Sequence, residues 1–142
     1  VVEAGVARIG RDQMEEAPVP WLVRAERAVG ARTPLRSRIG GLRGAGQLPM
    51  VPPDVGGWPS GAVWLAAAPV VSRASLAHAL AAVAPRDGAA RRAAAAQDLG
   101  ALATALGRPE GFSPAASSAL GSLRSETDVL ALALCAPEQV VV

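Results

Sequence analysis

Apolar side chains recur along most of this chain at the spacing of one face of an α-helix. The first clear example runs from Pro18 to about Gly30, with arginine and glutamate on the opposite face. Its apolar positions are Trp21, Leu22, Ala25, Ala28 and Val29. Pro18 and Pro20 suit a first helical turn and Gly30 suits a stop, so the pattern predicts one helix over this range.

A second helix is predicted from about residue 33 to residue 44. Thr33 followed by Pro34 is typical of an N-cap and the first helical position after it. A sparse apolar face follows at Leu35, Ile39 and Leu42. Glycines at 40, 41, 44 and 46 weaken this helix, because each costs about 1 kcal/mol relative to alanine in a helix interior. The same glycines would let another helix approach closely.

Helical spacing resumes after a proline- and glycine-rich loop at about 49–60. The further predicted helices span residues 62–69, 70–84, 89–106, 113–120 and 125 onward. Ser113 before Pro114, and Ser125 before two acidic residues, are start signals for the last two. No segment alternates apolar and polar residues as a strand does. We therefore predict an all-α fold, an irregular bundle of roughly six or seven helices.

The loop contains PPDVGGWP at residues 52–59, which cannot be helical because prolines remove amide donors and restrict the residues before them. Pro52 and Pro53 would hold the chain extended, and Asp54 could accept a nearby backbone N–H. The next two residues are glycines, which permit positive φ. Trp58 would then enter the core just before the next helix. On this interpretation the loop is a structural clasp between two helices.

The composition indicates a thin core within one domain of 142 residues. Hydrophobic residues make up 51% of the chain, but many are alanine, with one Phe, no Tyr and three Trp. Alanine buries little apolar area, so a core of this kind indicates that the chain is part of a larger protein and packs against the rest of it. Residues 1–17 are predicted to be a linker or the frayed end of a preceding helix. Residues 18–142 would form a helical domain, the C-terminal portion of a larger protein.

All 14 basic residues are arginine, and the net charge of +2 permits polyanion binding without requiring it. Six of them fall within twenty residues and could form a stripe that contacts phosphates. They are Arg24, Arg27, Arg32, Arg36, Arg38 and Arg43. No aromatic residue alternates with them to stack on bases. A solvated face is therefore the preferred interpretation, and nucleic acid is not the expected partner.

Residues suited to catalysis or metal binding are few. One histidine, His78, and one cysteine, Cys135, cannot make a structural zinc site, and the acidic residues are scattered. Ser75 lies three residues before His78 on a predicted helix, but no acid nearby in sequence would orient the ring. The segment GGLRGAG at 40–46 lacks the preceding strand and the Gly-Lys ending of a phosphate loop. We expect no catalytic residue, metal or cofactor, and expect Cys135 to be a small buried apolar side chain.

No run of about 18 apolar residues exists, so the sequence predicts no transmembrane helix. The first residues also lack the basic start and apolar core of a signal peptide. These observations leave the cellular compartment open.

The region 46–77 resembles the signature of a large bacterial family, the domain of unknown function 1800 family. The matching positions are Gly46, Gln47, Pro52, Pro53, Val55, Gly57, Trp58, Pro59, Gly61, Trp64 and Arg73. The helix before this region and the segment LALALCAPEQVVV are also similar to the family, so the resemblance reaches from about residue 10 to the end. Met50 departs from it, because an aromatic residue often stands before the Pro-Pro pair.

The resemblance implies a helical fold and a longer protein that is often exported, but it supplies no activity or catalytic residue. The leading hypothesis is a non-catalytic structural and interaction region. Its partner would be the N-terminal part of its own full-length protein, or another protein. An alternative is a ligand or active-site cleft completed by that N-terminal part and lined by Gln47, Asp54, Trp58 and Arg73, since long irregular loops are often functional. A second alternative is weak polyanion binding by the arginine stripe.

Overall fold

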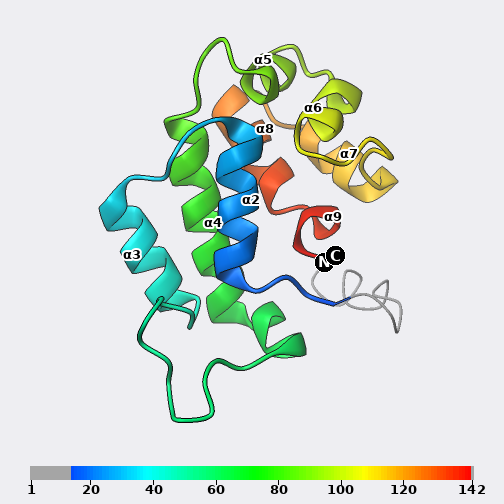
Figure 1. Cartoon of the computed structure of the whole chain (residues 1–142). Coiled ribbons are helices and arrows are strands. Elements are labelled where there is room, and N and C mark those ends of the chain that lie inside the picture. The colour runs from blue at the N-terminus through cyan, green and yellow to red at the C-terminus, as the bar shows by residue number, and fades with distance from the viewer. Residues whose placement is uncertain (1–13, 142) are drawn as a thin grey trace.

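The computed structural model describes residues 14–141, which form eight α-helices and one 3₁₀-helix (Figure 1). The α-helices are α2 (Pro18–Val29), α3 (Leu35–Gly44), α4 (Ala67–Ala82), α5 (Ala89–Ala95), α6 (Leu99–Ala105), α7 (Pro114–Gly121), α8 (Glu126–Leu134) and α9 (Pro137–Val140), and the 3₁₀-helix is η1 (Gly61–Leu65). No β-sheet forms within 14–141. The predicted all-α fold is confirmed. Most of the predicted linker, residues 1–13, lies outside the described residues.

Helix α4 lies at the centre of the bundle and packs against α2, α3 and α8 (Figure 1). The shorter α5 packs against α6, α8 and α2. The buried core between them consists mainly of leucine and alanine, as the composition predicted. Trp21 of α2 is the largest core side chain, and its indole N–H donates to the Leu134 carbonyl of α8 at 3.1 Å. This bond satisfies the one polar atom that burial of the ring would otherwise leave unpaired.

Several predicted helix ends are confirmed. Gly30 ends α2 in the left-handed conformation with φ of 76°, which glycine adopts without strain. Ser113 caps α7 by accepting the Ala116 N–H at 3.3 Å. Ser125 caps α8 in the same way, accepting the Asp128 N–H at 3.4 Å. These caps satisfy amides in the first turn of each helix that have no intrahelical partner.

The predicted start and apolar face of the second helix are wrong. Helix α3 begins at Leu35, and the Thr33 side chain does not cap it; instead the Thr33 N–H donates to Glu26 at 2.8 Å. Leu35 and Ile39 are exposed, and Leu42 is the buried apolar side chain of α3. The reason is that α3 meets α4 through small residues rather than through a stripe of large ones.

The prediction that glycines admit a close helix is confirmed at the α3–α4 contact. A Cβ atom on Gly41 would lie 2.4 Å from Cγ of the buried Leu76, and one on Gly44 would lie 2.6 Å from the Ser72 hydroxyl oxygen. Both distances are shorter than van der Waals contact. Because glycine has no side chain, Gly41 and Gly44 allow α3 to lie this close to α4.

The single helix predicted over 89–106 is wrong, because the chain turns between α5 and α6. Gln97 has φ of 55°, and the Asp98 carboxylate accepts the Ala101 N–H at 2.9 Å as the N-cap of α6. The Gln97 side chain donates to the Leu123 carbonyl at 2.7 Å. An N-cap and one long-range hydrogen bond thus stabilise a break that the apolar spacing does not reveal.

Candidate functional site

The loop between α3 and η1, residues 47–60, projects away from the bundle (Figure 1). The Asp54 carboxylate accepts the Gly56 N–H at 2.7 Å, and the Gly57 N–H donates to the Asp54 carbonyl at 3.2 Å. This is the local acceptor role predicted for Asp54. Gly57 has φ of 92° and Met50 has φ of 67°, an uncommon conformation for a non-glycine residue. The loop is therefore a sequence of tight turns built from its own backbone.

The loop exposes large apolar side chains to solvent. Met50, Val51 and Val55 are all exposed, and Val55 is fully accessible. The prediction that Trp58 enters the core is wrong, because its side chain is 38% exposed. Trp64 of η1 is buried instead, and its ring would lie 3.9 Å from a Cβ atom on Gly46. The core tryptophan of this region is supplied by η1, where the chain returns to the bundle.

The base of the loop is fixed by polar contacts to α2. Gln47 accepts the Val19 N–H at 2.8 Å through its side-chain oxygen. That amide lies in the first turn of α2, where the helix itself offers no acceptor. Gln47 therefore acts as a cap supplied from outside the helix, 28 residues along the chain.

Arg73 of α4 lies below this base and is 2% exposed. Its guanidinium donates to the Trp64 carbonyl at 3.0 Å and to the Glu16 carbonyl, and it lies 5.9 Å from the ring centre of Trp21. Burial lowers the pKa of Arg73 from its usual value, while Cys135 and Glu16 act in the opposite direction. The side chain ties η1 and the segment before α2 to α4, and its Nε atom has no hydrogen-bond partner among the described residues.

The four ligand-binding candidates thus fall into two pairs. Gln47 and Arg73 lie at the base of the loop, where each bonds to the backbone of the segment 16–19 or of η1. Asp54 and Trp58 lie in the exposed part of the loop. The remaining motif residues of the loop are also at its surface, apart from the half-buried Gly57. They are Pro52, Pro53, Val55 and Pro59.

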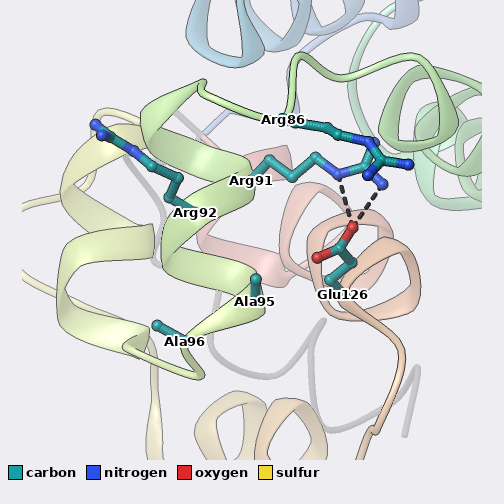
Figure 2. Close-up of a pocket in the computed structure, with 6 residues that line it drawn as sticks. All are labelled: Arg86, Arg91, Arg92, Ala95, Ala96 and Glu126. Atoms are coloured by element: carbon teal, nitrogen blue, oxygen red, sulfur yellow. Dashed lines mark hydrogen bonds and ion pairs between the residues drawn. The ribbon is translucent and has the colours of Figure 1, made fainter.

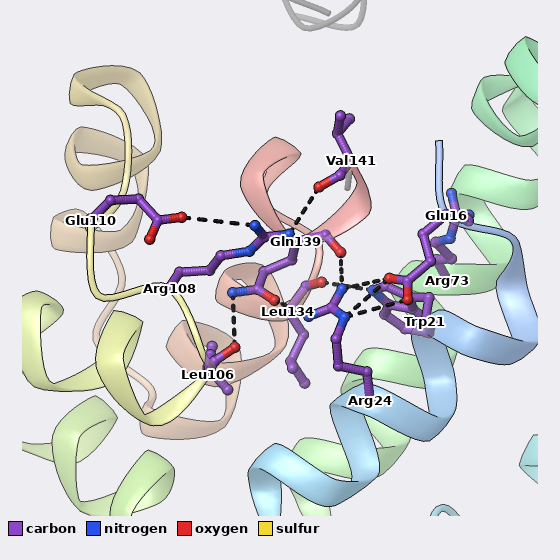
Figure 3. Close-up of polar contacts among 10 residues, drawn as sticks. All are labelled: Glu16, Trp21, Arg24, Arg73, Leu106, Arg108, Glu110, Leu134, Gln139 and Val141. Atoms are coloured by element: carbon purple, nitrogen blue, oxygen red, sulfur yellow. Dashed lines mark hydrogen bonds and ion pairs between the residues drawn. The ribbon is translucent and has the colours of Figure 1, made fainter. Parts of the chain in front are cut away.

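A second feature, the polar clasp, joins the start and the end of the described chain (Figure 3). It is distinct from the loop and consists of Glu16, Arg24, Arg108, Gln139 and Val141. Arg24 of α2 pairs with Glu16 at 2.6 Å, and it also donates to the side-chain oxygen of Gln139 at 2.5 Å and to the Gln139 carbonyl. Arg108 donates to the Val141 carbonyl at 2.8 Å. No pattern in the sequence identifies Arg108 as part of a polar site. It follows Gly107 at the end of a helix, and only the tertiary structure places it beside α9.

The six arginines of the predicted stripe have different surroundings. Arg24 belongs to the clasp, and Arg38 pairs with Glu26 at 2.9 Å. The other four are exposed: Arg27, Arg32, Arg36 and Arg43. Ion pairing inside the fold therefore accounts for two of the six.

The remaining candidate chemistry is limited. Ser75 donates to the Val71 carbonyl of its own helix at 3.2 Å rather than to His78. The fold does bring an acid to His78, since Asp128 of α8 lies 3.9 Å from its ring, but both side chains are exposed. Burial raises the pKa of the Cys135 thiol to about 11, although Arg73 opposes this. Among residues 14–141 no group of His, Cys, Asp and Glu side chains is placed to hold a metal ion.

A family model described as Protein of unknown function (DUF1800) matches residues 6–141. The match covers almost all of the 142 residues, so the chain belongs to this family. Comparison with curated proteins and with solved structures finds no match. Within the described part of the chain, no helix is both long enough and apolar enough to cross a membrane.

Proposed function

We propose that this DUF1800 domain is a non-catalytic structural and interaction module, and that its projecting loop 47–60 binds an apolar surface of a protein partner. The observation that supports the proposal is the exposure of Met50, Val51, Val55 and Trp58 on one short loop. Apolar side chains that gather on a surface instead of in the core are typical of interaction sites. Tryptophan and methionine are also enriched in protein interfaces.

The loop is prepared for binding because its backbone is already constrained. Pro52 and Pro53 restrict the chain on one side of the turn, and Asp54 closes the turn itself. Gln47 fixes the start of the loop to α2. A preordered loop loses less conformational entropy on binding than a flexible one, so more of the contact energy appears as affinity.

The alternative function, a ligand cleft lined by Gln47, Asp54, Trp58 and Arg73, has less support. The side-chain oxygen of Gln47 and two nitrogens of Arg73 already bond within the fold. Asp54 holds its own turn. These groups would have to exchange internal partners for a ligand.

Site-specific photo-crosslinking in the native cell tests the interaction proposal. A crosslinker at Val51 is compared with one at Val83, an exposed apolar residue just after α4. We expect a discrete crosslinked protein from position 51 and none from position 83. The affinity of that purified protein is then measured for the wild-type chain and for Val55→Ser with Trp58→Ser.

The loop substitutions should weaken binding by at least about tenfold, because anchoring side chains of an interface contribute 1–2 kcal/mol or more each. They should change the thermal melting temperature only slightly, since Val55 is fully accessible and Trp58 is not part of the core cluster. Equal crosslinking at the two positions, or unchanged affinity in the double variant, would contradict the proposal.

A further inference from the structure

A surface groove of about 550 Å³ lies between α2 and the end of α6. Its charged lining residues are Arg24, Arg27 and Arg108, and no acidic side chain lines it. Mostly small residues, among them Thr104 and Gly107, form the rest of the wall together with Leu106. The Arg27 side chain is exposed, and those of Arg24 and Arg108 are partly buried. Three arginine side chains therefore line one groove.

Two of these arginines are held in place by α9 and the residue after it (Figure 3). Arg24 donates to the Gln139 carbonyl, and Arg108 donates to the Val141 carbonyl at 2.8 Å. The two acceptors are separated by two residues, a span of at most about 7 Å of chain. Gln139 itself is 1% exposed, so the support beneath both arginines is part of the core. Both guanidinium groups are thus fixed before any ligand binds. Each nitrogen of Arg24 already donates within the fold, whereas Arg108 donates to the described residues through Nη2.

Arg27 supplies a cation that the fold leaves uncompensated. It follows Arg24 by three residues, so it lies on the same side of α2. Its side chain is exposed and forms no ion pair or hydrogen bond with any described residue. By contrast, Arg24 is paired with Glu16, and Arg108 lies 3.8 Å from the exposed Glu110. The group of three arginines and two glutamates keeps a net positive charge.

The hollow of about 410 Å³ beside α5 shows the opposite arrangement (Figure 2). Arg91 donates two hydrogen bonds to Glu126, at 2.8 and 2.6 Å, and a third to the Ala84 carbonyl at 2.9 Å. Glu126 is itself part of the lining, so the carboxylate that neutralises Arg91 lies inside that hollow. There the arginine joins α5 to α8 and has a structural role. The groove at α2 has no carboxylate in its lining, although Glu16, outside the lining, pairs with Arg24.

We propose that the α2–α6 groove binds the phosphate group of a small phosphorylated molecule. A phosphate monoester presents three acceptor oxygens and a charge between −1 and −2 at neutral pH. Guanidinium groups match such oxygens with paired N–H donors. Arg27 and Arg108 have donors available for these oxygens, and Arg24, whose nitrogens already bond to Glu16 and Gln139, orders the groove wall. A carboxylate offers two oxygens and one charge, so the groove should hold it less tightly than a phosphate.

Titration of the 142-residue chain with inorganic phosphate, followed by NMR, tests the assignment. The reporters are the backbone amide of Gly107 and the side-chain Nε–H of the groove arginines. We expect saturable shifts at these positions, and weaker binding of acetate than of phosphate. Arg27→Gln should weaken phosphate binding about tenfold, since a charge-assisted hydrogen bond contributes about 1.5–3 kcal/mol. Arg27 makes no contact that folding requires, so this variant should fold normally.

Arg36→Gln is the matched control, because Arg36 is also exposed and the change in net charge is the same. It should alter phosphate affinity by less than about twofold, the effect of long-range charge alone. Equal weakening by Arg27→Gln and Arg36→Gln would overturn the proposal, because binding would then reflect overall charge. Acetate binding as tight as phosphate binding, or no saturation by phosphate, would overturn it as well.

Discussion

Arg73 combines two properties that rarely coincide, because it is a buried cation and it has no carboxylate hydrogen-bonded to it. Its donors meet the carbonyls of Trp64 and Glu16, and its face lies over Trp21. Backbone carbonyls and an aromatic ring together can compensate a buried guanidinium without a full opposite charge. The cost of burial is evident in the lowered pKa of the group.

Replacement of this arginine tests whether its hydrogen bonds outweigh the cost of burying it. We expect Arg73→Met to lower the free energy of unfolding by about 2 kcal/mol, because buried carbonyls without donors cost about 1–3 kcal/mol each and removal of the buried charge offsets part of this. Urea unfolding provides the measurement. Arg36→Met on the exposed face of α3 should change stability by less than about 0.5 kcal/mol. A neutral or stabilising effect of Arg73→Met would show that desolvation dominates at this site.

Cys135 leads to a prediction for alkaline pH. The chain contains no lysine and no tyrosine, so no other side chain ordinarily titrates in the range of its thiol. Burial raises the pKa of its thiol from 9.0 to about 11. Between those values the folded protein keeps a proton that the unfolded chain releases, so the free energy of unfolding falls as pH rises. The total loss should be about 3 kcal/mol, from about two pKa units at about 1.4 kcal/mol each. Urea unfolding from pH 8 to about pH 11 should show this decline in the wild type.

Cys135→Ala is the control for this pH dependence. No other side chain of the sequence has an ordinary pKa between that of the N-terminus and that of arginine. The variant should therefore lose most of the decline over the same interval. A decline of the same size in Cys135→Ala would assign the effect to another cause, such as self-repulsion as charge changes.

At the scale of secondary-structure elements, two adjacent glycines of α3 differ in how closely they approach α4. A Cβ atom on Gly41 would meet Leu76 at 2.4 Å, whereas one on Gly40 would have no atom within 4 Å. We expect Gly41→Ala to destabilise the fold by about 1–3 kcal/mol through overpacking. Gly40→Ala should stabilise it by about 0.5–1 kcal/mol through helix propensity. Thermal unfolding of the two variants measures both effects, and changes of the same sign would refute the steric explanation.

The elements that the sequence predicts well are those with local signals at their ends. Gly30 and the caps Ser113 and Ser125 act within one turn, so their residue types reveal them. The break at Gln97 depends partly on Leu123, which is 26 residues away, and apolar spacing continues across it. The exposure of Leu35 likewise depends on glycines facing α4 rather than on the pattern within α3.

The same distinction applies to the candidate sites. The turn at Asp54 follows from adjacent residues and was predictable. The prediction for Trp58 fails because burial depends on tertiary packing, and Trp64 of η1 is the tryptophan buried in this region. The groove was not predictable, because Arg27 and Arg108 come from segments 81 residues apart (108 − 27) and only the packing of α2 beside α6 brings them together.

At the scale of the whole molecule, the polar clasp links the first described residues to the last. The Glu16 N–H donates to the Val140 carbonyl at 2.8 Å, and Arg24 adds bonds to both the backbone and the side chain of Gln139. Arg108 adds a contact to Val141 from the end of α6. Contacts between the first and last described residues are long-range in sequence, so their loss should affect the entire fold and not one helix.

Two variants of the C-terminal segment separate the backbone part of the clasp from the side-chain part. Gln139→Leu keeps the buried volume and the backbone but removes the side-chain bonds to Arg24 and to the Leu106 carbonyl. We expect it to lower the free energy of unfolding by about 1–3 kcal/mol. Deletion of residues 139–142 also removes the Val140 and Val141 acceptors and the buried Val140 side chain, so the loss should exceed that of Gln139→Leu by at least about 2 kcal/mol. Urea unfolding followed by tryptophan fluorescence reports on both, because Trp21 is buried beside α8. Equal losses in the two variants would mean that the backbone contacts contribute little, and that the Gln139 side chain alone holds the two ends together.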